Sequence, residues 1–134
     1  MPGKTIIMIV DDDPDDRQFF KRALQKINSD HECIEAQDGY DALEQLQAIQ
    51  ELPHYIFLDI NMPRMDGRVC LAELKKDELL KNIPVIIYST STYQKDIELT
   101  NKLGASYYLI KPADIAKLPQ DISKAISMIE KPAF

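Results

Sequence analysis

Five short apolar segments, separated by longer stretches of helical periodicity, constrain the fold of this chain more than any other feature of its sequence. The segments are rich in Ile, Val, Leu or Tyr, as strands are. They span residues 5–10, 32–36, 55–58, 85–88 and 107–110. Four of them lack polar alternation, which is expected of parallel strands that are covered by helices on both faces. The segment at 32–36 alternates and suits an edge strand.

The stretches between these segments carry apolar residues at the i, i+3, i+4 and i+7 spacing of one buried helical face. The expected helical faces are Phe20, Ala23, Leu24 and Ile27; Leu43, Leu46 and Ile49; Cys70, Leu71 and Leu74; Tyr93, Ile97 and Leu103; and Ile115, Leu118, Ile122, Ala125, Ile126 and Ile129. Asp13 is a predicted N-cap, followed by Pro14 at the first helical position. We interpret Asp15 and Asp16 as acids of the first helical turn and Gly104 as a C-terminal cap.

Strands that alternate with helices predict a doubly wound α/β fold, built here from five βα units. The 134 residues suffice for one domain with a complete core but not for two ordinary domains. We therefore expect a single domain over residues 1–134, with its core at about residues 5–130.

Charge and cysteine content narrow the function classes. A formal net charge of −6 argues against direct binding to nucleic acid, which requires a surface rich in Lys and Arg. Cys33 and Cys70 lack CxxC spacing and neighbouring His ligands, so we interpret them as buried reduced thiols. The apolar stretch Thr5–Val10 is too short for a membrane span or a signal sequence, and we expect a cytoplasmic protein without a membrane partner.

The residues that follow the predicted strands are the candidates for chemistry, because open α/β sheets bind ligands at the carboxyl ends of their strands. These residues are Asp11 and Asp12 after the first strand, Asp59 after the third, Ser89 and Thr90 after the fourth, and Lys111 after the fifth. We expect the carboxylates, a hydroxyl group and the ammonium group to meet at one edge of the sheet.

Carboxylates that are crowded together repel each other, which favours a bound cation. Mg²⁺ prefers oxygen ligands and is commonly held by one or two carboxylates and a phosphoryl oxygen, which suits Asp11, Asp12 and Asp59. With the cation in place, a carboxylate can attack a phosphoryl group. Asp59 is the preferred nucleophile because it follows the central predicted strand, and Lys111 and Ser89 would neutralise charge on the phosphoryl oxygens.

Four motifs occur in order along the chain at residues 9–12 (Ile-Val-Asp-Asp), 58–67 (Leu-Asp-Ile-Asn-Met-Pro-Arg-Met-Asp-Gly), 84–89 (Pro-Val-Ile-Ile-Tyr-Ser) and 110–112 (Ile-Lys-Pro). Over about residues 5–130, this arrangement resembles the receiver domains of two-component response regulators. The resemblance implies a flavodoxin-like fold with five helices and a five-stranded parallel sheet in the order 2-1-3-4-5. It also implies a phosphorylated signalling switch that catalyses only its own phosphotransfer and slow dephosphorylation, rather than an enzyme with an external substrate.

The same resemblance implies roles for the site residues. Asp59 would be the phosphoacceptor, and Lys111 would contact the phosphoryl group. Asp12 would bind Mg²⁺ directly, Asp11 mainly through water, and the Asn61 backbone carbonyl would be a further ligand. Asp59 would complete the ligand set, and Mn²⁺ is expected to substitute for Mg²⁺.

Ser89 matches the switch hydroxyl of the family, and Tyr108 matches the aromatic residue that swings inward when this hydroxyl is drawn to the phosphoryl group. Thr90 stands where the family most often has Ala or Gly, so we expect it to narrow access to the phosphoryl site. The family usually has a cis peptide bond before the proline, which makes Lys111–Pro112 a candidate.

The implied phosphoryl donor is a phosphohistidine on a sensor histidine kinase or a histidine phosphotransfer protein, since the chain has no nucleotide-binding loop. Phosphorylation is expected to remodel the surface of the fourth helix, fifth strand and fifth helix, which an unidentified downstream protein would bind.

Two alternatives remain. A phosphatase of the haloacid-dehalogenase type would use Asp11 and Asp13 together with Ser89 and Lys111, but it leaves Asp59 unexplained. An interaction module that is never phosphorylated would not need the complete acidic pocket.

Overall fold

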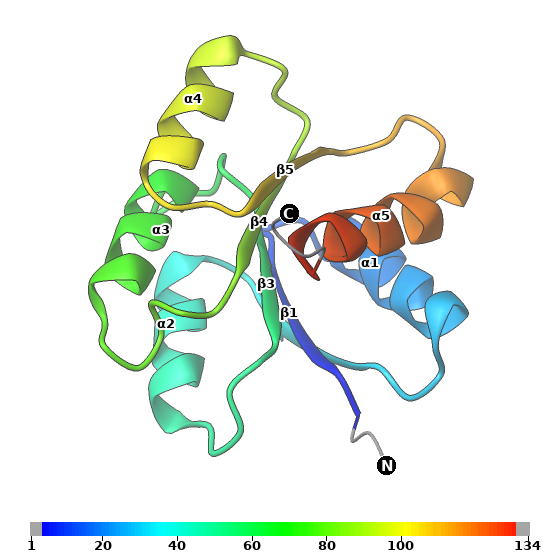
Figure 1. The fold of residues 1–134 in the computed structure, drawn as a ribbon, viewed down its shortest axis with the longest axis horizontal. Coiled ribbons are helices and arrows are strands. Elements are labelled where there is room, and N and C mark those ends of the chain that lie inside the picture. Colours follow the sequence, from blue (N-terminus) through cyan, green and yellow to red (C-terminus); the bar gives the residue numbers. More distant parts are fainter. Residues whose placement is uncertain (1–3, 131–134) are drawn as a thin grey trace.

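A computed structural model describes residues 4–130, and the ends of the predicted domain at 1–3 and 131–134 lie outside the described residues. Strands and helices alternate along the described chain (Figure 1). The strands are β1 (Ile6–Val10), β2 (Glu32–Ala36), β3 (Tyr55–Leu58), β4 (Val85–Ser89) and β5 (Tyr107–Ile110). The helices are α1 (Pro14–Ile27), α2 (Gly39–Ala48), α3 (Gly67–Lys76), α4 (Gln94–Lys102) and α5 (Leu118–Glu130), with a 3₁₀ turn (Ile115–Lys117) before α5.

All five strands form one parallel sheet in the order β2-β1-β3-β4-β5, which confirms the predicted fold. The predicted strand bounds agree with the observed ones to within one residue. Strand β2 lies at an edge of the sheet, as its alternating sequence indicated. Because β2 and β3 lie on opposite sides of β1, the connections change direction there, and ligands of such folds bind at this point.

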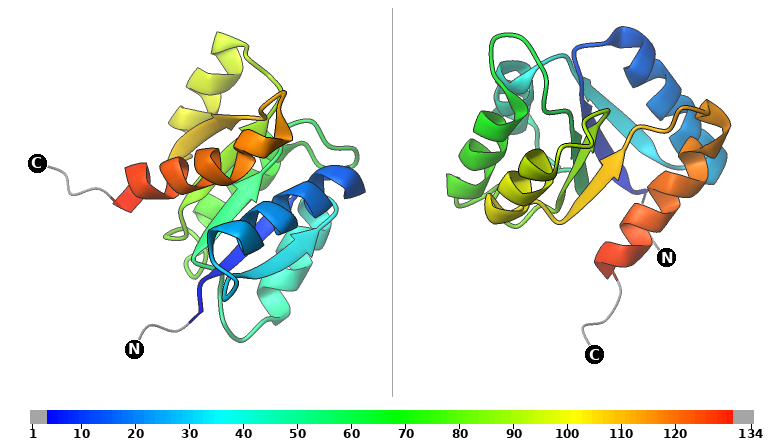
Figure 2. Two further views of the ribbon diagram at one scale, coloured as in Figure 1. Left: turned by 90° about the vertical axis from the view of Figure 1, so that its right-hand side faces the viewer. Right: turned by 90° about the horizontal axis from the view of Figure 1, so that it is seen from above.

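Helices cover both faces of the sheet. Helices α1 and α5 lie on one side, and α2, α3 and α4 lie on the other (Figures 1 and 2). Strands β1, β3 and β4 are buried along their whole length, which explains their continuous apolar sequences.

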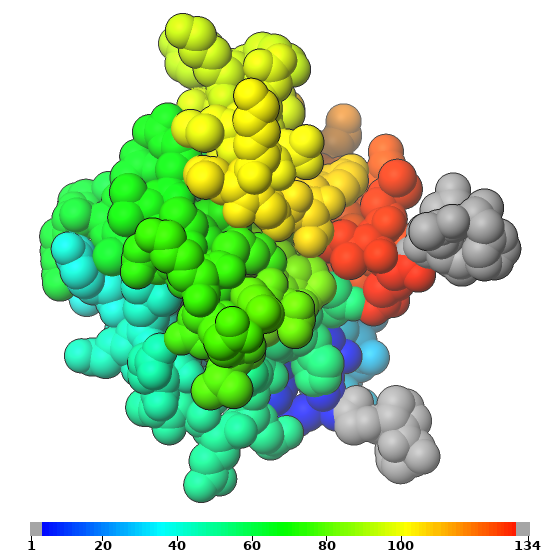
Figure 3. All heavy atoms as spheres, turned by 60° about the vertical axis from the view of Figure 1, so that its left-hand side comes forward, coloured from blue at the N-terminus to red at the C-terminus, as the bar shows by residue number. Residues whose placement is uncertain are grey.

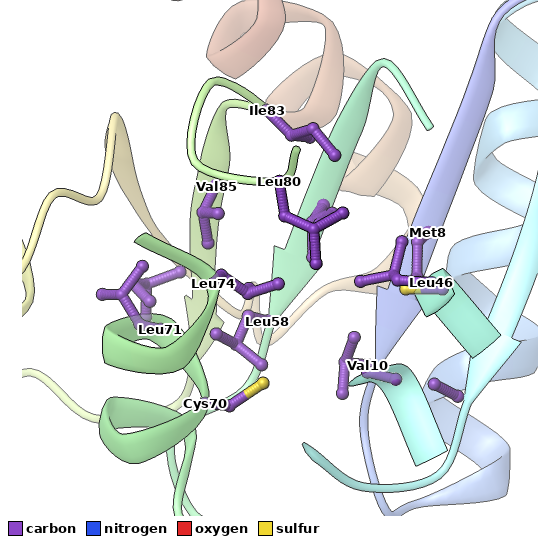
Figure 4. Packing of buried hydrophobic residues seen from close by; sticks show 14 of the residues in the cluster. Met8, Val10, Leu46, Leu58, Cys70, Leu71, Leu74, Leu80, Ile83 and Val85 are labelled. Carbon is purple, nitrogen blue, oxygen red and sulfur yellow. The ribbon is translucent and has the colours of Figure 1, made fainter. Parts of the chain in front are cut away.

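The alternating side chains of the central strands fill two cores. The core under α1 and α5 contains Ile7, Ile9, Phe20, Leu24, Phe57, Ile86, Leu118 and Ile122. The core under α2 and α3 contains Met8, Val10, Leu46, Leu58, Cys70, Leu71, Leu74 and Val85 (Figure 4). Each fully buried side chain of this size contributes about 1.5–3 kcal/mol. The sheet is therefore packed on both faces below the loops at its carboxyl end.

Several local predictions are confirmed. Asp13 is the N-cap of α1, and its side chain accepts a hydrogen bond from the Asp15 amide. Gly104 follows α4 with a φ of 107°, a conformation that favours glycine. Both cysteines are free thiols, although only Cys70 is buried and Cys33 is half-buried.

The predicted apolar face of the fourth helix was wrong at Tyr93. Tyr93 is the N-cap of α4 and is 76% exposed, because it precedes the first helical residue and does not follow the helical face. The buried residue of α4 is instead Thr100, whose hydroxyl donates to the Asp96 carbonyl oxygen at 2.8 Å. Helix α4 thus buries fewer residues than α3 or α5.

Candidate functional site

The strand register brings the predicted site residues together at the carboxyl end of the sheet. Strands β1 and β3 pair up to their last residues, so Asp11 and Asp59, which come next, are neighbours. The Asp59 amide donates to the Val10 carbonyl oxygen at 3.0 Å. On the other side of the site, the Lys111 amide donates to the Ser89 carbonyl oxygen at 2.8 Å.

Asp11, Asp12 and Asp59 form an acidic cluster in which one carboxylate oxygen of each residue lies within 4.8 Å of the others. Asp11 and Asp59 are buried, whereas Asp12 is exposed. One carboxylate oxygen of Asp59 accepts a hydrogen bond from the Ile60 amide at 2.8 Å, and one of Asp11 accepts from the Asp13 amide at 3.0 Å. The structure therefore brings the three predicted carboxylates together and orients the two buried ones.

The Lys111 ammonium group binds to this cluster. Its Nζ lies 2.8 Å from Asp11 Oδ2, 2.8 Å from Asp16 Oδ2 and 3.4 Å from Asp59 Oδ2. The interpretation of Asp16 as only an acid of the first helical turn was therefore incomplete. The start of α1 directs this carboxylate toward Lys111, and no spacing in the sequence indicates such a contact.

The charges of the site shift its pKa values. Burial raises the pKa of the Asp59 carboxyl from 3.8 to about 6, with Lys111 opposing and Asp11 adding to the rise. Burial also raises the pKa of Asp11. Burial alone would lower the pKa of Lys111, but its hydrogen bonds to Asp11 and Asp16 outweigh this effect and raise it. Lys111 thus stays charged, and Asp59, with a pKa of about 6, is ionised at neutral pH at a cost that a cation would relieve.

Two residues that support the site were missed by the sequence argument. The Arg17 guanidinium donates to the Asp11 carbonyl oxygen at 2.7 Å and to the Glu35 carboxylate at 3.2 Å. The Lys111 ammonium lies 5.2 Å from the centroid of the Tyr88 ring, within the range of a cation–π interaction. Neither Arg17 nor Tyr88 directly follows a strand, so a search confined to strand ends does not find them.

The loop between β3 and α3 depends on Gly67. The Gly67 amide donates to the Ile60 carbonyl oxygen at 2.8 Å. A Cβ atom at this position would overlap the Asp59 carbonyl oxygen, so only glycine allows α3 to begin so close to the end of β3. Asn61 lies in this loop and is exposed. Its role as a cation ligand stays a prediction.

Ser91 connects the two predicted switch residues. Ser89 is fully buried, and its hydroxyl oxygen accepts a hydrogen bond from the Ser91 amide at 3.1 Å. The Tyr108 hydroxyl donates to the Ser91 carbonyl oxygen at 2.9 Å. Between Ser89 and Ser91, Thr90 is exposed. The structure therefore links Ser89 to Tyr108 through a residue that the sequence did not single out.

Ser91 is also linked to α3 and α4, which lie side by side in Figure 3. Its hydroxyl donates to Asp96 Oδ2 at 2.5 Å, and Arg68 Nη1 donates to Asp96 Oδ1 at 3.1 Å. Arg68 Nη2 also donates to Asp66, the N-cap of α3, at 2.7 Å. These polar contacts join the loop after β4 to the first turns of both helices.

The prediction of a cis peptide bond was wrong. The Lys111–Pro112 bond is trans, and no cis bond occurs within residues 4–130. The trans form before proline is favoured by about 0.5–1 kcal/mol. With this bond trans, Lys111 still reaches its carboxylate partners.

Known proteins share this fold and these motifs. The family model of the response regulator receiver domain matches residues 7–123. The chain belongs to this family. The chain is 34% identical over 130 residues to Response regulator Rcp1 of Synechocystis sp.. The alignment covers 93% of this chain and 86% of Rcp1.

Solved receiver structures are equally similar. The phosphorylated cyanobacterial phytochrome response regulator RcpA has a TM-score of 0.84 and 35% identity, over 93% of this chain and 92% of that chain. The Mn²⁺-bound form of Rcp1 has a TM-score of 0.82 and 31% identity, over 97% of this chain and 98% of that chain. The protein is accordingly a two-component receiver domain whose function is phosphorylation-dependent signalling.

Family membership decides against the phosphatase alternative. That alternative required Asp13 as a site acid, but Asp13 is exposed and caps α1. Receiver domains work instead with sensor histidine kinases or phosphotransfer proteins. Within residues 4–130, no helix is long and apolar enough to cross a membrane.

The acidic cluster suits a divalent cation. Three carboxylates within reach of one another supply the hard oxygen ligands that such cations prefer. A structural neighbour, Rcp1, is known in an Mn²⁺-bound form. Divalent metal binding is therefore supported by the donor set of this chain and by the metal-bound form of this one neighbour.

Proposed function

We propose that the receiver domain accepts a phosphoryl group from a phosphohistidine onto Asp59 and thereby changes the surface that it presents to a partner. One observation carries this proposal. Asp59 is buried at the end of the central strand, with one carboxylate oxygen bound by the Ile60 amide and the other 3.4 Å from the Lys111 ammonium. This carboxylate is oriented and has a cationic neighbour that can bind the incoming phosphoryl oxygens.

Mg²⁺ is the cation that we propose for the site, with Mn²⁺ as a substitute. Asp11, Asp12, Asp59 and the Asn61 backbone carbonyl would hold it, as the family pattern implies. When bound, the cation neutralises charge on the phosphoryl oxygens. Asp12 is the exposed member of the acidic cluster and gives a cation access from solvent.

The transfer needs an ionised Asp59. One of its carboxylate oxygens forms a bond to phosphorus while the bond between phosphorus and the donor imidazole nitrogen breaks. The imidazole leaves with the bonding electron pair and is neutral because its other ring nitrogen carries a proton. Since the Asp59 pKa of about 6 lies below neutral pH, the nucleophile is ionised there. The receiver acts only on itself in this step, and we propose no external substrate.

A hollow beside Lys111 supports docking of the donor protein. Its volume is about 390 Å³, and its walls include Phe19, Pro112, Ile115 and the exposed Thr90. The mixture of apolar side chains around a cationic group suits a protein that delivers a phosphoryl group. We propose a sensor histidine kinase or a histidine phosphotransfer protein as the donor, acting in the cytoplasm. Thr90 stands at the edge of this hollow and would limit access to the phosphoryl group.

Readout would begin at Ser89. A phosphoryl group carries about two negative charges in place of the single charge of the carboxylate, and it brings strong hydrogen-bond acceptors. If the Ser89 hydroxyl turned to a phosphoryl oxygen, its bond with the Ser91 amide would break. Ser91 also holds Tyr108 and Asp96, so the change would reach α4 and β5. We propose that a downstream protein recognises the altered face formed by α4, β5 and α5.

Phosphorylation can be tested with a small donor. We would incubate the full chain with Mg²⁺ and acetyl phosphate and measure the intact mass. One added phosphoryl group is expected on the wild type, and none on Asp59→Asn. Asp13→Asn is the matched control, because asparagine also caps helices and Asp13 lies outside the acidic cluster.

Two results would contradict the proposal. Modification that persists in Asp59→Asn would place the phosphoryl group elsewhere. A wild type that neither acetyl phosphate nor a phosphorylated sensor kinase modifies would favour an interaction module that works without phosphorylation.

The route from Ser89 to Tyr108 needs a separate test. Ser89→Ala should still be phosphorylated, but the amide NMR shifts that phosphorylation causes in α4 and β5 should become smaller. Thr92→Ala is the control, since Thr92 is exposed in the same loop. Shifts of wild-type size in Ser89→Ala would rule out this route.

A further inference from the structure

Arg64 has an unusual backbone conformation for its residue type. Its φ is 67°, and within residues 4–130 no other non-glycine residue has a positive φ. The left-handed conformation costs roughly 1–2 kcal/mol for a residue with a Cβ atom. Such a conformation persists only where surrounding contacts hold it, and it often marks a functional segment. Arg64 lies in the loop that carries Asn61 from Asp59 to α3.

The Arg64 side chain binds the start of α2. Its Nη1 donates to Asp38 Oδ2 at 3.0 Å, and its guanidinium carbon lies 5.0 Å from the centroid of the Tyr40 ring. The Asp38 side chain is only 6% exposed, and its other oxygen caps α2 by accepting a hydrogen bond from the Asp41 amide at 2.8 Å. Arg64 therefore holds a carboxylate whose own position is fixed by the helix.

The backbone on the other side of Arg64 is equally constrained. The Met65 amide donates to the Pro63 carbonyl oxygen at 2.7 Å, which makes a tight turn with Arg64 at its centre. Met65 is buried against Gly39, where an added Cβ atom would lie 2.6 Å from the Met65 sulfur. The turn at Arg64 cannot shift without disturbing the first turn of α2.

We propose that Arg64 is a positioning residue: by binding Asp38 and Tyr40, it holds the loop in the conformation that lets the Asn61 backbone carbonyl bind the cation. The inference rests on the proposed function, which supplies the cation. Among the described residues, the guanidinium has an ion pair with Asp38 and none with the acidic cluster. Arg64 therefore acts through the backbone of the loop and not by direct contact with the cation.

The sign of one measurement separates this role from simple electrostatics. Removal of a positive charge near an acidic site should strengthen cation binding by reducing repulsion. Loss of a positioning contact should weaken binding, because the carbonyl ligand is no longer held in place. Arg64→Ala thus gives opposite results under the two explanations.

The test is Mn²⁺ affinity of the full, unphosphorylated chain, measured from the electron paramagnetic resonance signal of free Mn²⁺. Arg64→Ala and Arg64→Lys are expected to weaken binding about tenfold, the lower end of the usual effect of an outer-shell partner. Asp38→Asn, which keeps a side chain able to cap α2, should weaken it similarly. If the two residues act together, the double variant Arg64→Ala/Asp38→Asn should bind Mn²⁺ with the same affinity as the single variant that binds it less tightly. Arg22→Ala removes the same charge from an exposed site on α1 and should bind Mn²⁺ like the wild type.

Arg64→Gly distinguishes the side chain from the backbone, because glycine removes the guanidinium and relieves the left-handed conformation. We expect it to bind Mn²⁺ as weakly as Arg64→Ala. A metal-free readout is amide hydrogen exchange, which should become faster at Met65 in both variants.

The outcomes are separable. Wild-type affinity in Arg64→Gly, or equal or tighter binding in Arg64→Ala, would overturn the role of Arg64 and leave the proposed phosphorylation site standing. A wild type that binds no Mn²⁺ would overturn the cation site of the proposed function, and the role of Arg64 with it.

Discussion

Replacement of Asp59 by asparagine should stabilise the metal-free protein at neutral pH. Burial raises the pKa of the Asp59 carboxyl from 3.8 to about 6, so the folded protein binds this proton more tightly than the unfolded chain does. Ionisation therefore favours unfolding at pH values between the two pKa values and above. Each pKa unit corresponds to about 1.4 kcal/mol, which puts the cost of the ionised Asp59 at about 3 kcal/mol at pH 7.

Asparagine removes this cost without changing the shape of the side chain. Its carbonyl oxygen can still accept the hydrogen bond from the Ile60 amide. Lys111 loses a neighbour at 3.4 Å but keeps Asp11 and Asp16 at 2.8 Å each. We expect a net gain of about 2–3 kcal/mol, which is a rise of about 5–10 °C in Tm for a domain of this size.

The gain should depend on pH with a defined sign. At about pH 3 and below, under both pKa values, the carboxyl is neutral in both states, so Asp59→Asn and the wild type should be equally stable. The difference should grow between about pH 3 and pH 6 and then stay nearly constant. Asp30→Asn, in which an exposed carboxylate loses its charge, should change stability by less than about 0.5 kcal/mol.

Thermal unfolding followed by circular dichroism in EDTA, from pH 3 to pH 8, measures this difference. Added Mg²⁺ should narrow the difference, since the proposed cation would stabilise the wild type and the variant would lack the proposed Asp59 ligand. If Asp59→Asn is no more stable than the wild type at pH 7 in EDTA, Lys111 already neutralises Asp59 fully and the reasoning is refuted.

Three further variants test other parts of the site. Lys111→Met should lower the free energy of unfolding in EDTA by about 3–5 kcal/mol, because it leaves the fully buried Asp11 without its ammonium partner. Urea unfolding measures this loss, and added Mg²⁺ should restore part of the stability. Unchanged stability would contradict the charge argument. Gly67→Ala should lower the free energy of unfolding by at least about 3 kcal/mol, since the new methyl group overlaps the Asp59 carbonyl oxygen. A variant with the Tm of the wild type would disprove that close approach. Asp96→Asn weakens the hydrogen bonds that join α4 to α3 and to the loop after β4. Amide hydrogen exchange in α4 should therefore become faster by the equivalent of about 1 kcal/mol, while exchange in α1 stays unchanged. Equal acceleration in both helices would argue against a local contact.

Most of the fold could be predicted because its causes are local in the sequence. Continuous apolar segments mark strands that are buried on both faces, and the strand ends then place Asp11, Asp59 and Lys111 together. The strand order came from the four motifs and their resemblance to the family, because apolar periodicity does not specify which strands are neighbours. The order is confirmed by the structure.

The contacts that could not be predicted depend on how whole helices are placed. Asp16 reaches Lys111 only because α1 begins beside the loop after β5, and Ser91 reaches Asp96 only because α4 begins beside the loop after β4. The bond from Arg64 to Asp38 joins two loops through a backbone conformation that arginine rarely adopts. No spacing or periodicity in the chain signals such pairs.

Lys111 contacts the same carboxylate groups that a cation would use. Its ammonium contacts both Asp11 Oδ2 and Asp59 Oδ2, so the proposed cation would compete with Lys111 for these two carboxylates. Two positive charges in one small site repel each other strongly where water is scarce. We therefore expect a bound cation to weaken the contacts of Lys111 with Asp11 and Asp59, while Asp16 keeps the ammonium at the site. A phosphoryl group on Asp59 would then supply new oxygens that the Lys111 ammonium can contact.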